Sequence, residues 1–167
     1  MDITLKEIIW QQFGAAIDML ENAIVACPNE VWGSRLELSE FWYLAFHTLF
    51  WLDFYLSESS EGFYPPAPFT LVELDPAGLL PERVYSKDEL INYLEHGRRK
   101  CRVVINSMTE EKSDQHFVFE SFDLNFTELL LYNMRHVQHH AAQLNLILRQ
   151  KINSAPRWVR QSKTPLS

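Results

Sequence analysis

The sequence predicts an all-α protein, a four-helix bundle in which a long proline-rich crossover joins the second and third helices. Three observations support this class. Four segments of about 20 residues repeat apolar side chains at helical spacing. Five of the eight prolines fall within one segment, between the second and third of these helices. A composition of 47% apolar and 22% charged residues over 167 residues is typical of one globular domain, which we expect to span 1–167.

The first helix is expected from Leu5 to Ala26. Thr4 and Glu7 have the spacing of a capping box at its start, and Pro28 follows its end. One stripe of this helix is expected to face the core: Leu5, Ile8, Ile9, Gln12, Phe13, Ala16, Ile17, Leu20 and Ile24.

The second helix is expected from Ser39 to Ser57, with Ser39 as its N-cap. Its side chains are apolar on nearly every face, among them Phe41, Trp42, Leu44, Phe46, Leu49, Phe50, Trp51, Leu52, Phe54 and Tyr55. A helix that is apolar all round is usually buried on several sides.

The third helix is expected from Lys87 to Met108, with a capping box of Ser86 and Glu89. The fourth is expected from Phe126 to Gln150, beginning near Asn125 or Thr127. The stretch between them, residues 115–122, alternates loosely and favours an extended chain.

The crossover spans residues 58–85 and holds the prolines at 65, 66, 68, 76 and 81. Proline removes backbone donors and resists both helices and central strands. We therefore expect this segment to lie over the bundle or to cover a site, as long connections in small domains often do.

Composition excludes several classes of function. A net charge of −7 and a pI near 5.3 argue against nucleic-acid binding, which needs clustered Lys and Arg. The most apolar stretch, Phe41 to Leu56, is too short to span a bilayer and contains His47 and Asp53, so no membrane partner is expected. Cys27 and Cys101 are far apart and form no C-x-x-C motif, and two free thiols suit a cytoplasmic protein.

The C-terminal end is basic. From Arg149 onward there are five basic residues and no acidic ones. Such a tail can dock on an acidic body, but a solubilising end is the expectation favoured by its composition.

Three histidines carry the strongest functional signal. His136 and His140 are four residues apart, so their side chains lie 40° apart on one face of the fourth helix. That spacing lets two imidazoles bind one metal ion. His139 pairs with His136 at a three-residue spacing but faces the core less squarely. His47 lies in the middle of the most hydrophobic helix, where an imidazole needs a hydrogen-bond partner or a metal.

One buried histidine alone is more often a satisfied core residue than a ligand. An inward-facing pair together with a third histidine in another buried helix favours a three-histidine metal site. No Glu-x-x-His, H-E-x-x-H or G-x-S-x-G motif occurs, which removes the ferritin-like di-iron site, the zincin protease and the hydrolase nucleophile elbow. With no carboxylate ligand apparent, such a metal keeps positions open for water or substrate.

The run from His136 to Leu144 resembles the H-x-x-H-H-x-G-Q pattern of the DinB-like superfamily, which includes the YfiT-type metalloenzymes. The resemblance implies a four-helix bundle of variant up-and-down topology. It also implies one divalent metal, zinc or nickel, held by His47, His136 and His140, with His139 as a neighbour. Ala142 departs from the pattern, because the family often has glycine there.

The family implies no single reaction. Some relatives are transferases or isomerases that use a low-molecular-weight thiol such as mycothiol or bacillithiol, and others are described as hydrolases. The resemblance therefore implies a metal-dependent transferase or hydrolase with a small-molecule substrate and, as a second cofactor, such a thiol. Tyr43, Glu40 and His139 are the candidates for a general base.

Two alternatives stay open at this level. One is a non-catalytic module that binds a small ligand or a structural metal through a closed ligand set. The other is a purely structural bundle with packed histidines that dimerises through exposed aromatic side chains. Bundles of this size often form a homodimer, although no heptad seam marks an exposed face.

Overall fold

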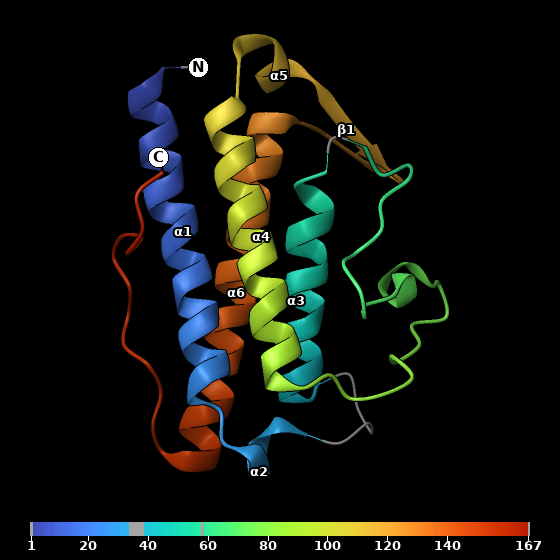
Figure 1. Ribbon diagram of the computed structural model, residues 1–167, viewed down its shortest axis with the longest axis vertical. Helices are drawn as coiled ribbons and strands as arrows, with labels where there is room; N and C mark the ends of the chain where they lie inside the picture. The colour runs from blue at the N-terminus through green and yellow to red at the C-terminus, as the bar shows by residue number, and fades with distance from the viewer. Residues whose placement is uncertain (1, 34–38, 58, 167) are drawn as a thin grey trace.

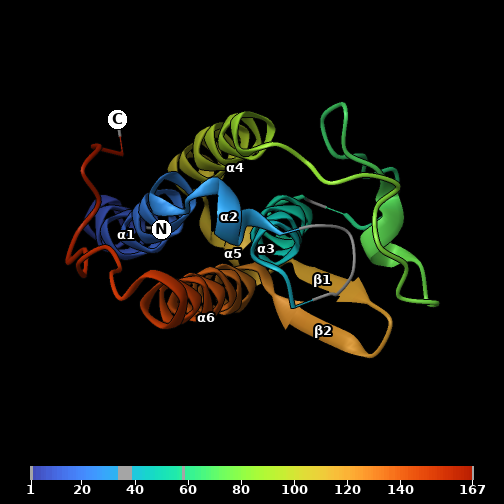
Figure 2. The same cartoon turned by 90° about the horizontal axis from the view of Figure 1, so that it is seen from below.

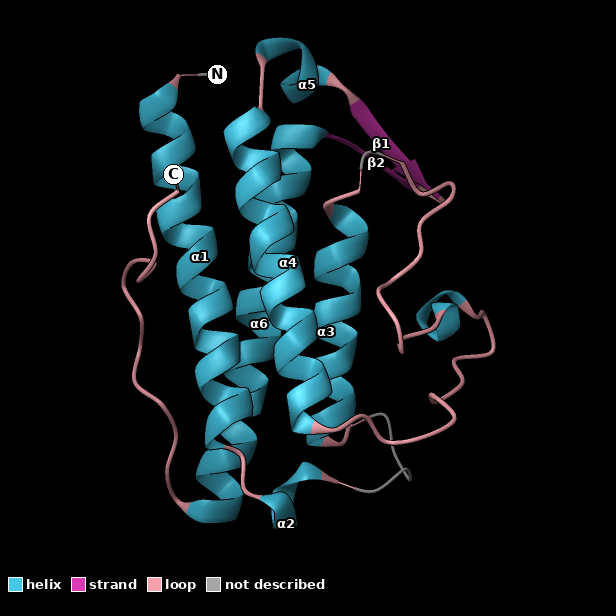
Figure 3. Ribbon diagram, viewed as in Figure 1, coloured by secondary structure: helices cyan, strands magenta, loops and turns pink. Residues whose placement is uncertain are grey.

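The computed structural model describes residues 2–33, 39–57 and 59–166, and the regular structure in those ranges is helical apart from one small hairpin (Figure 1 and Figure 3). The long helices there are α1 (Ile3–Ala26), α3 (Phe41–Tyr55), α4 (Lys87–Ser107) and α6 (Phe126–Ile152). The shorter elements are α2 (Asn29–Trp32), the 3-10 helix η1 (Leu71–Leu74), α5 (Glu110–Asp114), β1 (His116–Phe119) and β2 (Phe122–Asn125). The expected helical character is confirmed, and the hairpin is an addition to it.

The long helices pack in pairs around a shared apolar core. α1 lies against α4 and α6, and α3 lies against the same two helices, so that the end view shows all four around one centre (Figure 2). The largest fully buried side chains include Trp10, Phe13, Trp42, Phe46, Phe50 and Tyr93. Helices α3 and α4 run in the same direction, opposite to α1 and α6 (Figure 1). The chain between α3 and α4 therefore has to return along the outside, which is the path of residues 59–85.

The predicted starts of the first two long helices are wrong. α1 begins directly after Asp2, whose backbone is extended, so Thr4 and Glu7 lie within the first turns and form no capping box. α3 begins after Glu40, which holds the extended N-cap position and leaves Ser39 outside the helix. Neither N-cap side chain makes a capping hydrogen bond, so packing and not capping determines where these helices start.

The predicted starts of the other two long helices are confirmed. Ser86 Oγ accepts a hydrogen bond from Glu89 N at 3.2 Å, and Glu89 Oε2 accepts one from Ser86 N at 2.8 Å. At α6, Asn125 Oδ1 accepts a hydrogen bond from Glu128 N at 2.9 Å. Both caps satisfy backbone donors that the first turn of a helix leaves free.

The expected core stripe of α1 is correct in part. Leu5, Ile8 and Gln12 are exposed, whereas the buried members are Ile9, Phe13, Ala16, Ile17, Leu20 and Ile24. Leu5 and Ile8 are 43% and 55% exposed. Leu5, Ile8 and Gln12 follow one another at helical spacing along one edge of the stripe, while Ile9 and Trp10, in the same turn as Ile8, are buried. The apolar pattern therefore predicted the centre of the buried face and placed its edge wrongly.

The stretch at 115–122 turns back on itself as a hairpin. β1 and β2 are antiparallel, with Phe117 opposite Leu124. Phe117 is buried and meets the rings of Phe54 and Tyr55 at the end of α3. The expected extended chain is thus present, and it covers the end of α3 that points away from α2 (Figure 3).

The basic tail is docked, which corrects the favoured expectation of a free solubilising end. It runs back along α1 (Figure 1), where Ser162 N donates to Gln11 O at 2.9 Å and Trp10 Nε1 donates to Thr164 O at 2.8 Å. A Cβ at Gly14 would stand 2.5 Å from Ser162 Oγ, so glycine permits this close approach. Because the contacts use backbone groups of the tail, its net charge did not reveal them.

Candidate metal centre

Three histidines from two helices meet at one point. His47 comes from the middle of α3, and His136 and His140 come from adjacent turns of α6. One nitrogen of each ring can be chosen so that all three lie within 4.8 Å of one another. The ring centroids are 5.4, 4.9 and 4.5 Å apart, and Nε2 of His136 lies 3.4 Å from Nε2 of His47. The structure thus brings together the three residues that the sequence singled out.

Buried contacts hold the two helices in the register that this cluster needs. Val137 and Ala141, the residues that follow His136 and His140, are fully buried and anchor α6. The side chain of Asn133, also fully buried, donates from Nδ2 to Leu52 O on α3 at 3.0 Å. A buried amide that uses a backbone carbonyl as its partner fixes the two helices against sliding.

Two side chains fix how the imidazoles are turned. Nδ1 of His47 lies 2.6 Å from Glu73 Oε2, and Nδ1 of His140 lies 2.7 Å from Gln143 Oε1. Both partners are acceptors, so each Nδ1 carries the proton and each Nε2 keeps a lone pair for the centre of the cluster. Metal-binding histidines typically have such a partner on the second ring nitrogen.

Glu73 is the functional residue that sequence reasoning missed. It lies on η1 in the proline-rich segment, and its carboxylate also accepts a hydrogen bond from Trp51 Nε1 at 3.0 Å. No spacing rule relates residue 73 to His47, because their contact is made across 26 positions by a segment without periodic pattern. Only the burial of an acid in a loop marks it, and burial is not visible in one sequence.

The three proposed general bases occupy different places. Tyr43 lies beside His47, with ring centroids 6.2 Å apart, and it contacts Glu73. Glu40 accepts a hydrogen bond from the indole of Trp42 at 2.7 Å, at the start of α3. His139 is exposed, and its ring stands 5.1 Å from that of His140, outside the group of three.

His96 lies outside the cluster and contacts a buried acid. Its side chain is 39% exposed, and Nε2 lies 3.4 Å from Oδ1 of the buried Asp53. Tyr93 and Lys100 also contact Asp53, so this group ties α4 to α3. His116 is exposed on the hairpin.

Electrostatics keep two of the imidazoles ready to bind a cation. Burial, reinforced by the neighbouring imidazoles, lowers the pKa of His136 to about 3 and that of His140 to about 4. Burial alone would raise the pKa of the Glu73 carboxyl, but its hydrogen bond with His47 and the charge of His47 outweigh burial and lower it. Near neutral pH the site therefore combines neutral His136 and His140 with a carboxylate behind His47.

The donor set is compatible with a divalent cation. Within the described residues, the buried Nδ1 of His136 has no hydrogen-bond partner, a defect that costs about 1–3 kcal/mol in a core. Three imidazole nitrogens suit borderline ions such as zinc and nickel. Among the described residues, no acidic or thiol group joins the three histidines, so three protein ligands leave coordination positions open.

Metal-free protein is expected to lose stability as the pH falls from about 7.5 to about 5.5. His136 and His140 have pKa values of about 3 and 4 when folded, against a reference value of 6.5. Below pH 6.5 the unfolded chain therefore binds more protons than the folded chain, and the free energy of unfolding falls. Allowing for the partial exposure of both rings, we expect a loss of about 1–2 kcal/mol, measured by urea unfolding after EDTA treatment.

The matched control is the double variant His136→Gln/His140→Gln, which cannot take up these protons. Its free energy of unfolding should change less over the same pH range. If the free energy of unfolding depended equally on pH in both proteins, groups other than His136 and His140 would cause that dependence. The two imidazoles would then not be held neutral in the folded chain.

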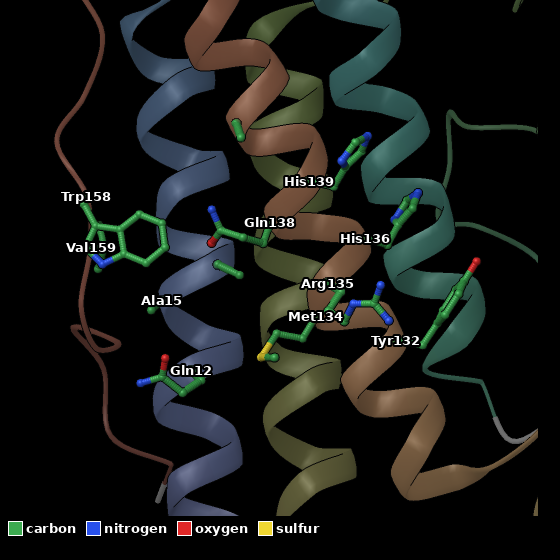
Figure 4. Close-up of a pocket in the computed structure, with 12 residues that line it drawn as sticks. Gln12, Ala15, Tyr132, Met134, Arg135, His136, Gln138, His139, Trp158 and Val159 are labelled. Carbon is green, nitrogen blue, oxygen red and sulfur yellow. The ribbon is translucent and has the colours of Figure 1, made fainter.

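A cleft of about 690 Å³ opens beside the cluster, between α6, α1 and the C-terminal tail. Its lining is Gln12, Ala15, Ala16, Tyr132, Met134, Arg135, His136, Gln138, His139, Ala142, Trp158 and Val159. Figure 4 shows His136 and His139 on the side of α6 that faces α3, whereas Gln138 and Trp158 lie toward α1. The cleft and the histidine cluster therefore share His136.

Comparison with known families agrees with the motif. The family model described as the DinB superfamily matches residues 12–144. The matched range contains all three histidines of the cluster as well as Glu73 and Gln143. No curated protein and no solved structure matches the chain.

Proposed function

This chain belongs to the DinB superfamily, and from that premise we propose that it binds one divalent metal ion, zinc or nickel, through His47, His136 and His140. We propose further that it is a metal-dependent enzyme of the thiol-transferase or hydrolase type. The observation that carries the proposal is the convergence of three imidazole nitrogens within 4.8 Å from two packed helices.

The open coordination of the site supports enzyme chemistry over a structural metal. Structural zinc sites are closed by four protein ligands, whereas catalytic sites keep a position for water or substrate. A bound metal would lower the pKa of a thiol or a water molecule placed there. Around it, Glu73 and Gln143 orient two of the ligands through Nδ1.

Tyr43 is suited to donate a hydrogen bond and not to accept a proton. Burial, together with its hydrogen bond to Glu73 and the charge of Glu73, raises the pKa of its hydroxyl. A tyrosine with a raised pKa keeps its proton at neutral pH. Of the three candidates for the general base, Glu40 and His139 remain.

The substrate we propose is a small molecule that reaches the metal from the cleft at His136. The lining mixes apolar and aromatic walls with a few polar groups, as small-molecule sites do. A low-molecular-weight thiol is the second cofactor that the family membership suggests. The net charge of −7 argues against a nucleic-acid partner, and no helix in the described ranges is long and apolar enough to cross a membrane.

The architecture we propose is the family's four-helix bundle of variant up-and-down topology, as one domain over 1–167. The pairing of α1 and α3 with α4 and α6 supports it, and so does the return path of residues 59–85. Residue 58, the first of the expected crossover, lies outside the described residues. A homodimer and a cytoplasmic location stay predictions.

The test is elemental analysis of tag-free protein purified without nickel chromatography. We expect about one zinc or nickel ion per chain, either as purified or after reconstitution. Metal-loaded protein is then assayed for thiol transfer and for hydrolysis, with EDTA-treated protein as the control. A wild-type chain that retains no metal even after reconstitution would overturn the proposal and favour a packed histidine core.

A further inference from the structure

An acidic side chain is buried in the middle of the proline-rich segment. The side chain of Glu73 is only 3% exposed, although η1 has no fully buried residue and its neighbours Leu71, Val72 and Leu74 are partly exposed. Acidic side chains are almost never buried unless they are paired, since taking a carboxylate out of water is costly. The burial of Glu73 therefore needs a compensating set of partners.

Those partners come from one face of α3. Tyr43, His47 and Trp51 follow one another at four-residue spacing, and all three contact the carboxylate of Glu73. His47 and Trp51 use the same oxygen, Oε2, at 2.6 and 3.0 Å. Two donors on one carboxylate oxygen fix both its position and the orientation of the His47 ring.

Apolar contacts also hold the loop that carries Glu73. Its side chains packed against the core are Leu71, Val72, Leu74, Leu80 and Val84. Phe69 and Tyr85 are buried at its two ends, where Phe69 stacks on Tyr93 of α4 with centroids 4.3 Å apart. Between those ends, Pro81 is the one residue in residues 70–84 that is buried as a whole. Glu73 adds a buried charged side chain to these apolar contacts, and its hydrogen bonds join the loop to α3.

We propose that Glu73 is a positioning residue that couples the metal centre to the loop 70–84. This inference rests on the proposed function, because it assumes that His47 binds a metal. The carboxylate keeps the proton of His47 on Nδ1 and directs the lone pair of Nε2 at the metal. Since coupling between two sites is reciprocal, a metal on His47 also strengthens the hold on Glu73 and tightens the loop.

Zinc affinity tests the first part of the proposal, that Glu73 positions His47 for the metal. Glu73→Gln keeps an acceptor for His47 and Trp51 but removes the charge, whereas Glu73→Ala removes both. We expect zinc affinity, measured by competition with a chromophoric chelator, to fall by about 10–100-fold in Glu73→Ala and by less in Glu73→Gln. Glu82→Ala is the matched control, because Glu82 is an exposed acid of the same loop.

Hydrogen exchange tests the second part of the proposal, that a metal on His47 tightens the loop 70–84. We expect zinc to slow amide exchange in residues 70–84 of the wild type and of Glu82→Ala, and to leave exchange there unchanged in Glu73→Ala. The rest of α3 and α4 should exchange alike in all three proteins, which shows that each is folded.

The outcomes separate the two proposals. A wild-type chain that binds no zinc would overturn the proposed function itself. A wild type that binds zinc while Glu73→Ala matches Glu82→Ala in affinity and in exchange would overturn only the role of Glu73. The coupling stands if Glu73→Ala loses both zinc affinity and the zinc-dependent protection of the loop.

Discussion

Replacing His140 with alanine is expected to lower zinc affinity by on the order of a thousand-fold. Zinc sites built from protein side chains are worth about 10–16 kcal/mol, so the share of one ligand out of three is about 3–5 kcal/mol. His140 can be removed without disturbing the core, because it is only partly buried and its partner Gln143 is also partly exposed. The measurement is chelator competition with zinc, beside elemental analysis of the purified variant.

His139→Ala is the matched control for this variant. His139 precedes His140 on the same helix turn, is exposed, and lies outside the group of three. Its removal should leave zinc affinity within a few-fold of the wild type. Equal losses in His139→Ala and His140→Ala, or full metal content in His140→Ala, would refute the ligand assignment.

Thermal unfolding gives a second view of the same result. A metal that binds only the folded chain raises stability by about 2.7 kcal/mol when its free concentration is 100 times the dissociation constant. Zinc should therefore raise the unfolding temperature of the wild type and of His139→Ala. It should have little effect on His47→Ala, His136→Ala or His140→Ala.

Local patterns predicted the parts of this protein whose causes are local. The capping box joins Ser86 to Glu89, three positions further along, and the face shared by His136 and His140 spans one turn, so both are visible in the sequence alone. His47 could be added because it lies in a helix apolar on every side, which has to be buried near its neighbours. That the three rings converge is a finding of the structure, while their role as ligands stays a prediction.

The contacts that complete the site are not local and left no pattern. Glu73 reaches His47 from an irregular segment, and Asn133 looks like an ordinary polar residue until its hydrogen bond to Leu52 O is seen. The C-terminal tail docks through backbone groups, which carry no sequence signal at all. Local rules also misplaced the starts of α1 and α3, because packing overrode the capping preference of Thr4 and Ser39.

Arg98→Met is expected to lower the free energy of unfolding by about 3–5 kcal/mol, the largest stability effect that we predict for a single substitution. Arg98 is 6% exposed and donates hydrogen bonds to Asp18 and to Glu21 of α1, the second at 2.6 Å. Its Nε also donates to Glu95 at 3.0 Å. Burial lowers the pKa of the guanidinium, but the three carboxylates outweigh burial and raise it.

The loss of stability is large because Arg98→Met leaves the carboxylate of Asp18 buried. Asp18 is 1% exposed, and its other oxygen accepts a hydrogen bond from Lys163 N of the tail at 2.9 Å. Without Arg98 this carboxylate is a buried charge with no cation, and the contacts of α1 with α4 and with the tail are weakened together. A fall of roughly 10 °C in the unfolding temperature is the corresponding thermal result.

Two further variants separate the loss of a charge pair from the loss of a side chain. Arg99→Met removes the exposed arginine next in the chain and should change the free energy of unfolding by less than about 0.5 kcal/mol. Arg98→Met combined with Asp18→Asn removes both buried charges and should recover part of the lost stability, because the amide is cheaper to bury than the carboxylate.

If Arg98→Met proved no less stable than Arg99→Met, the buried ion pair of Arg98 and Asp18 would contribute nothing to the free energy of unfolding. If the double variant proved less stable than Arg98→Met, Asp18 would be needed for the tail contact even without its cation.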